Sequence, residues 1–301
     1  MNRILKLLLG LAAVLAVQPA LATLSIFACE PEWGALAKEL AGDKASIYVA
    51  TNALQDPHRI EARPSLIARA RSADLVVCTG AELEIGWLPL VQTQSGNSRI
   101  QTGQPGLFEA ARHVVTLEVP QRFDRAQGDV HPAGNPHVHL DPRNIAKIAT
   151  ALAERMAQLN PGEATQYRAR AKTFLERWQQ ATARWEKAGA PLKGMAIVVH
   201  HKNLSYLNSW LGLREVGSLE PKPGLPPTAT HLSELLANLA RDPAKAVLRA
   251  AYNDPRAADW LSERAKIPSV ALAYTIGGND KAQDLFGLFD DTIARLLAAA
   301  K

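Results

Sequence analysis

Three histidines from distant parts of the chain carry the chemistry that the sequence offers. His58 ends the stretch Gln-Asp-Pro-His, His137 opens His-Val-His-Leu-Asp-Pro, and His201 follows an apolar run that ends at Val199. Neutral imidazole is the commonest metal ligand and suits zinc and other transition metals. Each histidine follows a strand-like segment, so a fold that gathers the ends of these segments would build one metal site from all three.

Other histidines compete for these roles. His139 lies two residues beyond His137, and in an extended segment both side chains would point the same way. His200 precedes His201, and on a strand only one of the two would face a shared cleft. His131 lies in a polar loop, where it is either an exposed histidine or a residue that feeds metal to the site. The remaining two are interpreted as structural: His113 and His231.

The start of the chain predicts export. A basic beginning with Arg3 and Lys6 precedes the apolar run Leu7–Val17 and the small-residue site Ala20-Leu21-Ala22. This pattern is typical of a secretory signal peptide over residues 1–22, and the run is shorter than the roughly 20 residues that a spanning helix needs. We expect an exported, soluble mature protein that begins at Thr23. The cleavage site has no cysteine, which argues against a lipid anchor.

The charge balance argues against a nucleic-acid partner. Removing Arg3 and Lys6 lowers the formal net charge from +5 to +3. Lys and Arg alternate with Asp and Glu along the helical stretches, as on solvated faces, instead of forming a basic stripe.

The two cysteines each end a strand-like run. Cys29 closes Leu-Ser-Ile-Phe-Ala-Cys and Cys78 closes Asp-Leu-Val-Val-Cys. If the two strands are neighbours in a parallel sheet, their ends lie close enough for a disulfide, which an oxidising compartment would favour. Two buried thiols are the alternative. Neither cysteine has a CxxC partner, so a zinc site built on them is disfavoured.

Apolar strand-like runs alternate with helical periodicity through most of the mature chain, which predicts βαβ units and parallel sheets. The predicted strands cover residues 24–29, 45–50, 74–78, 195–199, 213–219, 246–250 and 269–273. The predicted helices cover residues 33–40, 64–71, 142–159, 161–187, 204–211, 231–241, 255–264 and 281–300.

This order predicts an α/β protein of two lobes with parallel sheets flanked by helices. Removal of 22 residues from the 301 leaves 279, more than one domain usually holds. We expect an N-terminal α/β lobe over residues 23–160, a long connecting helix over 161–190 and a C-terminal α/β lobe over 191–301. Ligands of open α/β sheets bind at the carboxyl ends of the strands, so the metal site belongs in the cleft between the lobes.

Four ordered motifs resemble one family, the metal-specific cluster A-I of substrate-binding proteins of ABC transporters. The matching stretches are Asp56-Pro57-His58 with Glu61 and Pro64-Ser65, then Ala73-Asp74-Leu75 with Gly80, Leu83-Glu84 and Trp87-Leu88, then Asn135–Pro142, and finally His201–Tyr206. The resemblance covers essentially the whole mature chain and is closest to the zinc-uptake type.

The resemblance implies a ligand set. His58, His137 and His201 fall on the family's metal-ligand positions, whereas His139 falls where the family usually has tryptophan. The family often supplies a carboxylate from the loop before the last helix, and Asp280 is the candidate in this chain, with water as the alternative. Arg59 and Arg63 depart from the family's usual residues near the first ligand.

The donor set favours zinc over manganese, because imidazole suits zinc and carboxylate oxygens suit manganese. The leading hypothesis is a monomeric periplasmic protein that captures zinc for an ABC-transporter permease, and not an enzyme. A zinc-dependent hydrolase is the first alternative, since three histidines and an open position also describe catalytic sites. The sequence has no HExxH motif, however. A stand-alone exported zinc chaperone or adhesin is the second alternative.

Overall fold

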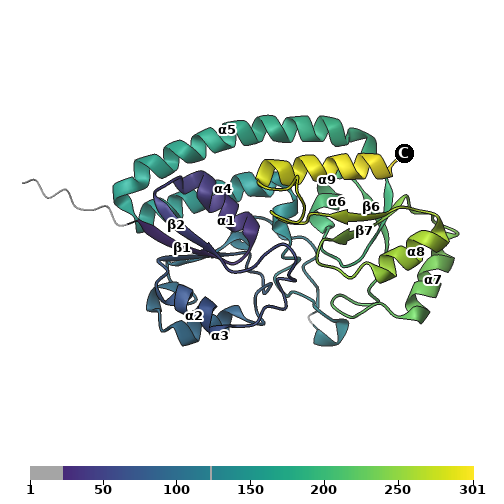
Figure 1. The fold of residues 1–301 in the computed structure, drawn as a ribbon, viewed down its shortest axis with the longest axis horizontal. Helices are drawn as coiled ribbons and strands as arrows, with labels where there is room; N and C mark the ends of the chain where they lie inside the picture. The colour runs from purple at the N-terminus through teal and green to yellow at the C-terminus, as the bar shows by residue number, and fades with distance from the viewer. Residues whose placement is uncertain (1–22, 123) are drawn as a thin grey trace, which may run out of the picture.

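The computed structural model describes residues 23–301 apart from residue 123, and it has two parallel four-stranded sheets joined by one long helix (Figure 1). The predicted two-lobe α/β fold is confirmed. The predicted signal peptide lies outside the described residues. Within the part of the chain described, no helix is both long and apolar enough to cross a membrane.

The N-terminal sheet has the strand order β2-β1-β3-β4, with all pairs parallel. Helices α1 and α4 lie on one side of it and α2 and α3 on the other (Figure 1). Its elements are β1 (Leu24–Ala28), α1 (Pro31–Ala41), β2 (Ala45–Val49), α2 (Pro64–Arg71), β3 (Leu75–Cys78), α3 (Leu88–Ser95), β4 (Leu107–Glu109) and α4 (Pro142–Leu159).

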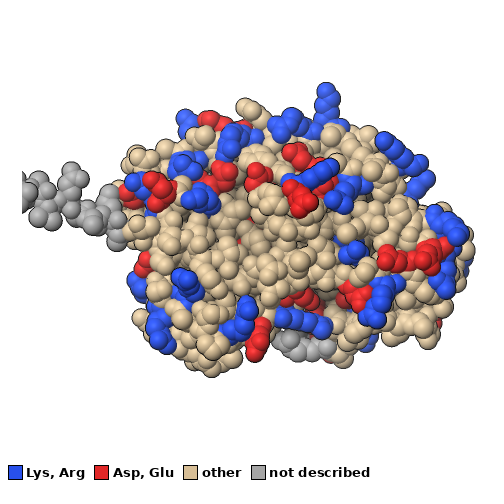
Figure 2. All heavy atoms as spheres, in the orientation of Figure 1, with Lys and Arg blue, Asp and Glu red and all other residues tan. Residues whose placement is uncertain are grey.

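The C-terminal sheet repeats this plan with the order β6-β5-β7-β8, again parallel throughout. Its elements are β5 (Ala196–Val199), α6 (Ser205–Leu211), β6 (Arg214–Ser218), α7 (Ala229–Leu239), β7 (Ala246–Ala250), α8 (Arg256–Ala265), β8 (Ser269–Leu272) and α9 (Leu285–Ala299). Basic and acidic side chains are interspersed over the face seen in Figure 2.

Helix α5 (Ala164–Gly189) runs along both lobes, with α9 beneath it (Figure 1). Its 26 residues span about 39 Å at 1.5 Å per residue. The indole of Trp178 donates to the carbonyl of Pro142 at 2.7 Å, and that of Trp185 donates to Asp290 Oδ1 at 2.5 Å. Because this one helix is fastened both to the start of α4 and to α9, it opposes large movements of the lobes.

The predicted disulfide is present between Cys29 and Cys78. Strands β1 and β3 are neighbours, and Ala28 is paired with Val77, so the two cysteines lie at the same edge of the sheet. The Cα atoms are 4.8 Å apart, within the range that a disulfide bridges.

Three elements differ from the prediction. Helix α3 was not predicted because its eight residues, with Pro89 in the first turn, have little amphipathic pattern. Strand β4 has only three residues, too few for alternation to be visible. The last helix begins at Leu285 instead of residue 281, because the Asp284 side chain caps it by accepting from the Gly287 amide at 2.7 Å.

Candidate metal centre

The structure brings His58, His137 and His201 together between the two lobes. One ring nitrogen of each lies within 4.8 Å of the others. The ring centres are 5.5 Å apart for His58 and His137, 5.6 Å for His58 and His201, and 5.7 Å for His137 and His201. The three sequence-predicted histidines therefore form one cluster.

Only one of the three directly follows a strand. His201 comes two residues after β5, whereas His58 is nine residues beyond β2 and His137 lies 28 residues beyond β4. The expectation that all three stand at strand ends is thus correct for His201 and wrong for the other two. Loops carry those two to the cleft, and local hydrogen bonds must hold them there.

The N-terminal lobe holds its two histidines by the same local device. In Asp56-Pro57-His58 and in Asn135-Pro136-His137, the first residue's Oδ1 accepts from the histidine amide at 3.0 Å in each case. Asp56 Oδ1 also lies 2.8 Å from His58 Nδ1, and Asn135 Oδ1 lies 2.7 Å from His137 Nδ1. The intervening proline, with its restricted backbone, suits such a turn.

His201 is held by a residue from farther along the chain. Its Nδ1 lies 2.6 Å from Glu220 Oε2, and the same oxygen accepts from the Gly224 amide at 2.8 Å. All three histidines thus have Nδ1 against an oxygen. Carboxylate or carbonyl partners of this kind fix the ring orientation and the tautomer of metal-binding histidines, and they leave Nε2 for the ion.

The remaining nitrogens fit a metal. Nε2 of His58 and of His137 are buried and have no hydrogen-bond partner among the described residues. Burial lowers the pKa of His137 well below its ordinary value, and the neighbouring His58 and His201 lower it further. A neutral imidazole with an open nitrogen is the form that a transition metal requires.

The hydrogen bond between Asp56 and His58 also shifts the carboxylate. Burial acts to raise the pKa of Asp56, but the hydrogen bond from His58 and its charge outweigh burial and hold that pKa below its ordinary value. Asp56 is therefore anionic, and its negative charge supports a cation bound to the same imidazole.

Motif residues outside the cluster position the first histidine. Trp87 Nε1 donates to the carbonyl of Pro57 at 3.0 Å, directly before His58. Gly86 lies against the His58 carbonyl, where an added Cβ would come within 3.0 Å of the oxygen. The Trp87 segment thus supports the His58 loop.

His139 lies outside the cluster. Residues Val138–Leu140 form a 3-10 turn, so the expectation of an extended His-x-His pair is wrong and the two rings diverge. His139 Nε2 lies 3.0 Å from the Tyr274 carbonyl, and Nδ1 lies 3.3 Å from Glu32 Oε1. With both nitrogens facing oxygens, this ring has a structural role.

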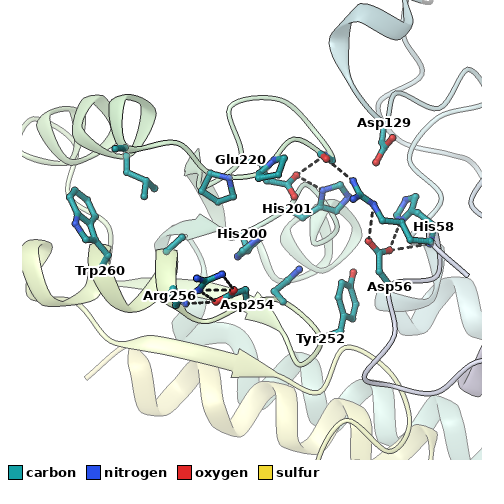
Figure 3. A pocket seen from close by; sticks show the side chains of 18 of the residues that line it. Asp56, His58, Asp129, His200, His201, Glu220, Tyr252, Asp254, Arg256 and Trp260 are labelled. Atoms are coloured by element: carbon teal, nitrogen blue, oxygen red, sulfur yellow. Dashed lines mark hydrogen bonds and ion pairs between the residues drawn. The ribbon is translucent and has the colours of Figure 1, made fainter.

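His200 and His201 both line the cleft. A cavity of about 620 Å³ runs from the His58 side across to α8, and Figure 3 shows both histidines on its wall with Glu220 above and Tyr252 below. The expectation that only one would face the cleft is wrong, because both residues lie beyond the end of β5, where strand alternation no longer applies.

Asp280 does not join the three histidines. It is exposed in the loop between β8 and α9, and the cluster of possible metal-ligating groups in the described structure does not include it. The neighbouring Asn279 binds the Lys281 and Ala282 amides and Asp291, which holds the loop in its own turn. Its role as the fourth ligand stays a prediction.

Sequence reasoning did not assign roles to Asp56, Asn135 or Glu220. The first two had a readable signal, since an Asp or Asn two residues before a histidine, with proline between, can bind that histidine's amide and ring. Glu220 had no such signal, because its 19-residue separation from His201 is bridged only by the fold.

The fold is that of a two-lobe α/β binding protein, and comparison with known proteins specifies the family. Residues 26–299 match the family model described as zinc-uptake complex component A, periplasmic (ZnuA). The match covers most of the chain, and the protein belongs to this family of metal-binding transport components.

Individual relatives are distant. The zinc-binding lipoprotein AdcA of Streptococcus pneumoniae is 23% identical over 202 residues, which are 66% of this chain but only 39% of AdcA. The high-affinity zinc uptake system protein ZnuA of Yersinia pestis is 25% identical over 228 residues, 72% of each chain. This protein therefore spans about two fifths of AdcA's length.

Solved structures share the fold. A crystal structure of ZnuA superposes with a TM-score of 0.78 at 20% identity and covers 93% of this chain and 100% of the other. A manganese-bound periplasmic metal-binding protein of Candidatus Liberibacter asiaticus gives a TM-score of 0.74 at 14% identity, covering 92% of this chain and 100% of the other.

Proposed function

We propose that this protein captures Zn²⁺ outside the cytoplasm and delivers it to the permease of an ABC importer. The observation that carries the proposal is the cluster of three imidazoles, two of them buried and that of His58 partly buried, each with Nδ1 held by an oxygen. Membership in the zinc-uptake family and the printed names of AdcA and ZnuA support zinc as the cargo.

Zinc is proposed over manganese because of the donor set. Nitrogen ligands suit zinc, whereas oxygen ligands suit manganese. The manganese-bound neighbour is similar in fold only, so it supplies no argument about the cargo of this chain.

In this proposal two lobes, residues 23–160 and 191–301, close around the ion while the helix of residues 161–190 limits their opening. His58 and His137 come from the first lobe and His201 from the second, so a bound ion joins the two. Export through a signal peptide that ends at Ala22, and action as a monomer without a catalytic step, belong to the same proposal.

The test is a metal titration of the metal-free protein with Zn²⁺ and Mn²⁺, alongside His58→Ala, His137→Ala and His201→Ala. We expect zinc to bind more tightly than manganese and each substitution to weaken zinc binding. His113→Ala is the matched control, because His113 stacks on Phe108 outside the cluster. Zinc binding that survives all three cluster substitutions would refute the site.

Transport needs its own test. In a strain that lacks this chain, growth in zinc-depleted medium should be restored by the intact gene and not by His137→Ala. If the intact gene and His137→Ala both restored growth, the role of this protein in growth would not depend on the metal site. Zinc-dependent hydrolysis of a simple ester, lost in His137→Ala, would instead favour the enzyme alternative.

A further inference from the structure

The cavity beside the metal centre is much larger than a metal ion needs. Its volume is about 620 Å³, and it extends from His58 and His201 to the wall that helix α8 forms. Sites for small organic molecules have volumes of about 300–1,000 Å³ and often lie between domains. An ion held by the three clustered imidazoles would fill only the end at His58. The rest of the cavity has the size of a site for a small organic ligand.

The end of the cavity at α8 is apolar. Figure 3 shows Trp260 there, opposite His58. The guanidinium of Arg264 stacks on the indole of Trp260 at 4.2 Å, which holds this ring in place. Further apolar residues line the cavity: Pro226, Pro227, Leu232 and Ala257. A hydrated ion makes no favourable contact with such a surface, whereas an apolar group of an organic ligand would be stabilised by burial against it.

The charges on the cavity wall favour a ligand without net charge. Four carboxylates line the cavity, those of Asp56, Asp129, Glu220 and Asp254. Two arginines line it as well, Arg59 and Arg256. A bound Zn²⁺ adds two positive charges, so that the positive and negative charges around the cavity balance. A ligand with several negative charges would therefore be repelled by the carboxylates, whereas a zwitterion finds charges of both signs.

His200 adds a polar group that the chain leaves without a partner. The residue lines the cavity but does not belong to the cluster of three histidines (Figure 3). It is only 7% exposed, and its Nδ1 is buried with no hydrogen-bond partner among the described residues. A buried polar atom without a partner is costly, so a ligand that bonds to this ring would remove a cost that the chain alone does not offset.

We propose that this cavity binds an amino acid with an apolar side chain together with the metal, so that the protein captures zinc as a complex with an amino acid. The inference rests on the proposed function. A tetrahedral zinc ion held by three imidazoles has one open position, and the carboxylate of the amino acid takes it. The ammonium group lies among the wall carboxylates, and the apolar side chain lies against Trp260.

The test is equilibrium dialysis of the intact protein, zinc-loaded and metal-free, against three radiolabelled probes. L-Phenylalanine and glycine carry the same ammonium and carboxylate groups and differ only in the side chain, whereas succinate carries two carboxylates and no ammonium group. We expect the zinc-loaded protein to bind L-phenylalanine about 10-fold or more tightly than glycine, because the apolar side chain is buried. Succinate should bind more weakly than L-phenylalanine, and the metal-free protein should bind L-phenylalanine more weakly than the zinc-loaded protein does.

Substitutions in α8 test the apolar end of the cavity. Trp260→Ala removes apolar surface and Ala257→Phe fills the space, so each should lower the preference for L-phenylalanine over glycine to about twofold or less. Glu263→Ala is the matched control, because Glu263 is an exposed residue of α8 that does not line the cavity. His200→Ala should weaken both amino acids by roughly 10-fold, the usual effect of losing a hydrogen bond to a charged group.

Several results would overturn the inference. They are no binding of L-phenylalanine by the zinc-loaded protein, equal binding of L-phenylalanine and glycine, equal binding with and without zinc, and binding of succinate at least as tight as that of L-phenylalanine. A preference that stays unchanged in both Trp260→Ala and Ala257→Phe would overturn it as well. Failure of His137→Ala to weaken zinc binding in buffer without amino acids would instead overturn the proposed function itself.

Discussion

Two buried polar regions lie where the two lobes meet, and both contain a histidine from the same short stretch. The metal centre includes His137. The second region, here called the acidic cluster, begins at Glu32, which lies against His139, and consists of Glu30, Glu32, Glu84, Thr79 and Thr275. In it, Thr275 donates to Glu32 at 2.5 Å, and Thr79 donates through its hydroxyl to Glu30 at 3.3 Å and through its amide to Glu84 at 2.7 Å.

The difference lies in what the polar atoms face. In the acidic cluster the carboxylates accept hydrogen bonds from Thr79 and Thr275, and both ring nitrogens of His139 lie near an oxygen, although His139 Nδ1 and Glu30 Oε1 make no hydrogen bond in the described structure. In the metal centre each ring is held on one side only, and Nε2 of His58 and of His137 are buried without a hydrogen-bond partner in the described structure. A buried polar atom without a partner is costly, and such atoms occur in both regions. The metal centre differs because the fold brings one nitrogen from each of three imidazoles within 4.8 Å of the others, as a bound ion requires.

The largest effect that we expect is the difference in zinc affinity between substitutions of His137 and of His139. His137→Ala removes a proposed ligand and should reduce zinc affinity by about 100-fold or more, above the range typical of outer partners. His139→Ala should leave zinc affinity within about threefold but lower the free energy of unfolding by about 1–3 kcal/mol, because a buried partner of Glu32 is lost.

Zinc titration and urea denaturation of both variants measure the two quantities. Equal losses of zinc affinity in His137→Ala and His139→Ala would contradict this difference and would mean that His139 is also a possible metal ligand.

A smaller effect should follow from the oxygens behind the ligands. Asn135→Ala and Glu220→Ala leave the imidazoles in place but free the Nδ1 atoms of His137 and His201. Loss of such partners costs roughly 10- to 100-fold in metal affinity. Glu220→Gln keeps an oxygen acceptor and should lose less than Glu220→Ala. Competition with a chromophoric chelator measures each affinity, and zinc binding unchanged in both alanine variants would show that the fold alone orients the rings.

The contrast explains how far the sequence could predict the site. Spacing and residue type were enough to narrow the candidates to His58, the pair His137 and His139, and the pair His200 and His201, because imidazole is the commonest metal ligand. They could not separate His137 from His139, since the outcome depends on a three-residue 3-10 turn and on Glu32 and Tyr274, which come from opposite ends of the chain. The resemblance to a family made that choice instead.

The fold was more predictable than the site. Strands such as β5 and β7 are short, continuous apolar runs buried in parallel sheets, and such runs stand out between amphipathic helices. The docking of the His131 loop on Pro223 depends on one backbone hydrogen bond between the lobes, from the Asp129 amide, for which no local pattern exists. The sequence therefore left His131 either as an exposed histidine or as a feeder of metal.

The smallest effect concerns the acidic cluster and pH. Burial raises the pKa of Glu84 to about 7, although hydrogen bonds from the Thr79 and Gly80 amides oppose the shift. Burial, together with the charge of Glu84, raises the pKa of Glu30 as well. A carboxyl group whose folded pKa is raised binds its proton more tightly in the folded state, so its contribution to stability is complete below about pH 4.5 and is lost as the pH rises through about 7.

Glu84→Gln removes this titration and keeps an oxygen that can accept from the Thr79 amide. The difference in unfolding free energy between Glu84→Gln and the intact protein should therefore grow in favour of the variant as the pH rises from about 4.5 to 8. Urea midpoints across this range measure it. The control is Glu154→Gln, because the Arg168 hydrogen bond lowers the pKa of Glu154 and moves its titration below the window. Parallel curves for Glu84→Gln and the intact protein would mean that the pKa of Glu84 is the same in the folded and unfolded states, so that burial in the acidic cluster does not favour its protonated form.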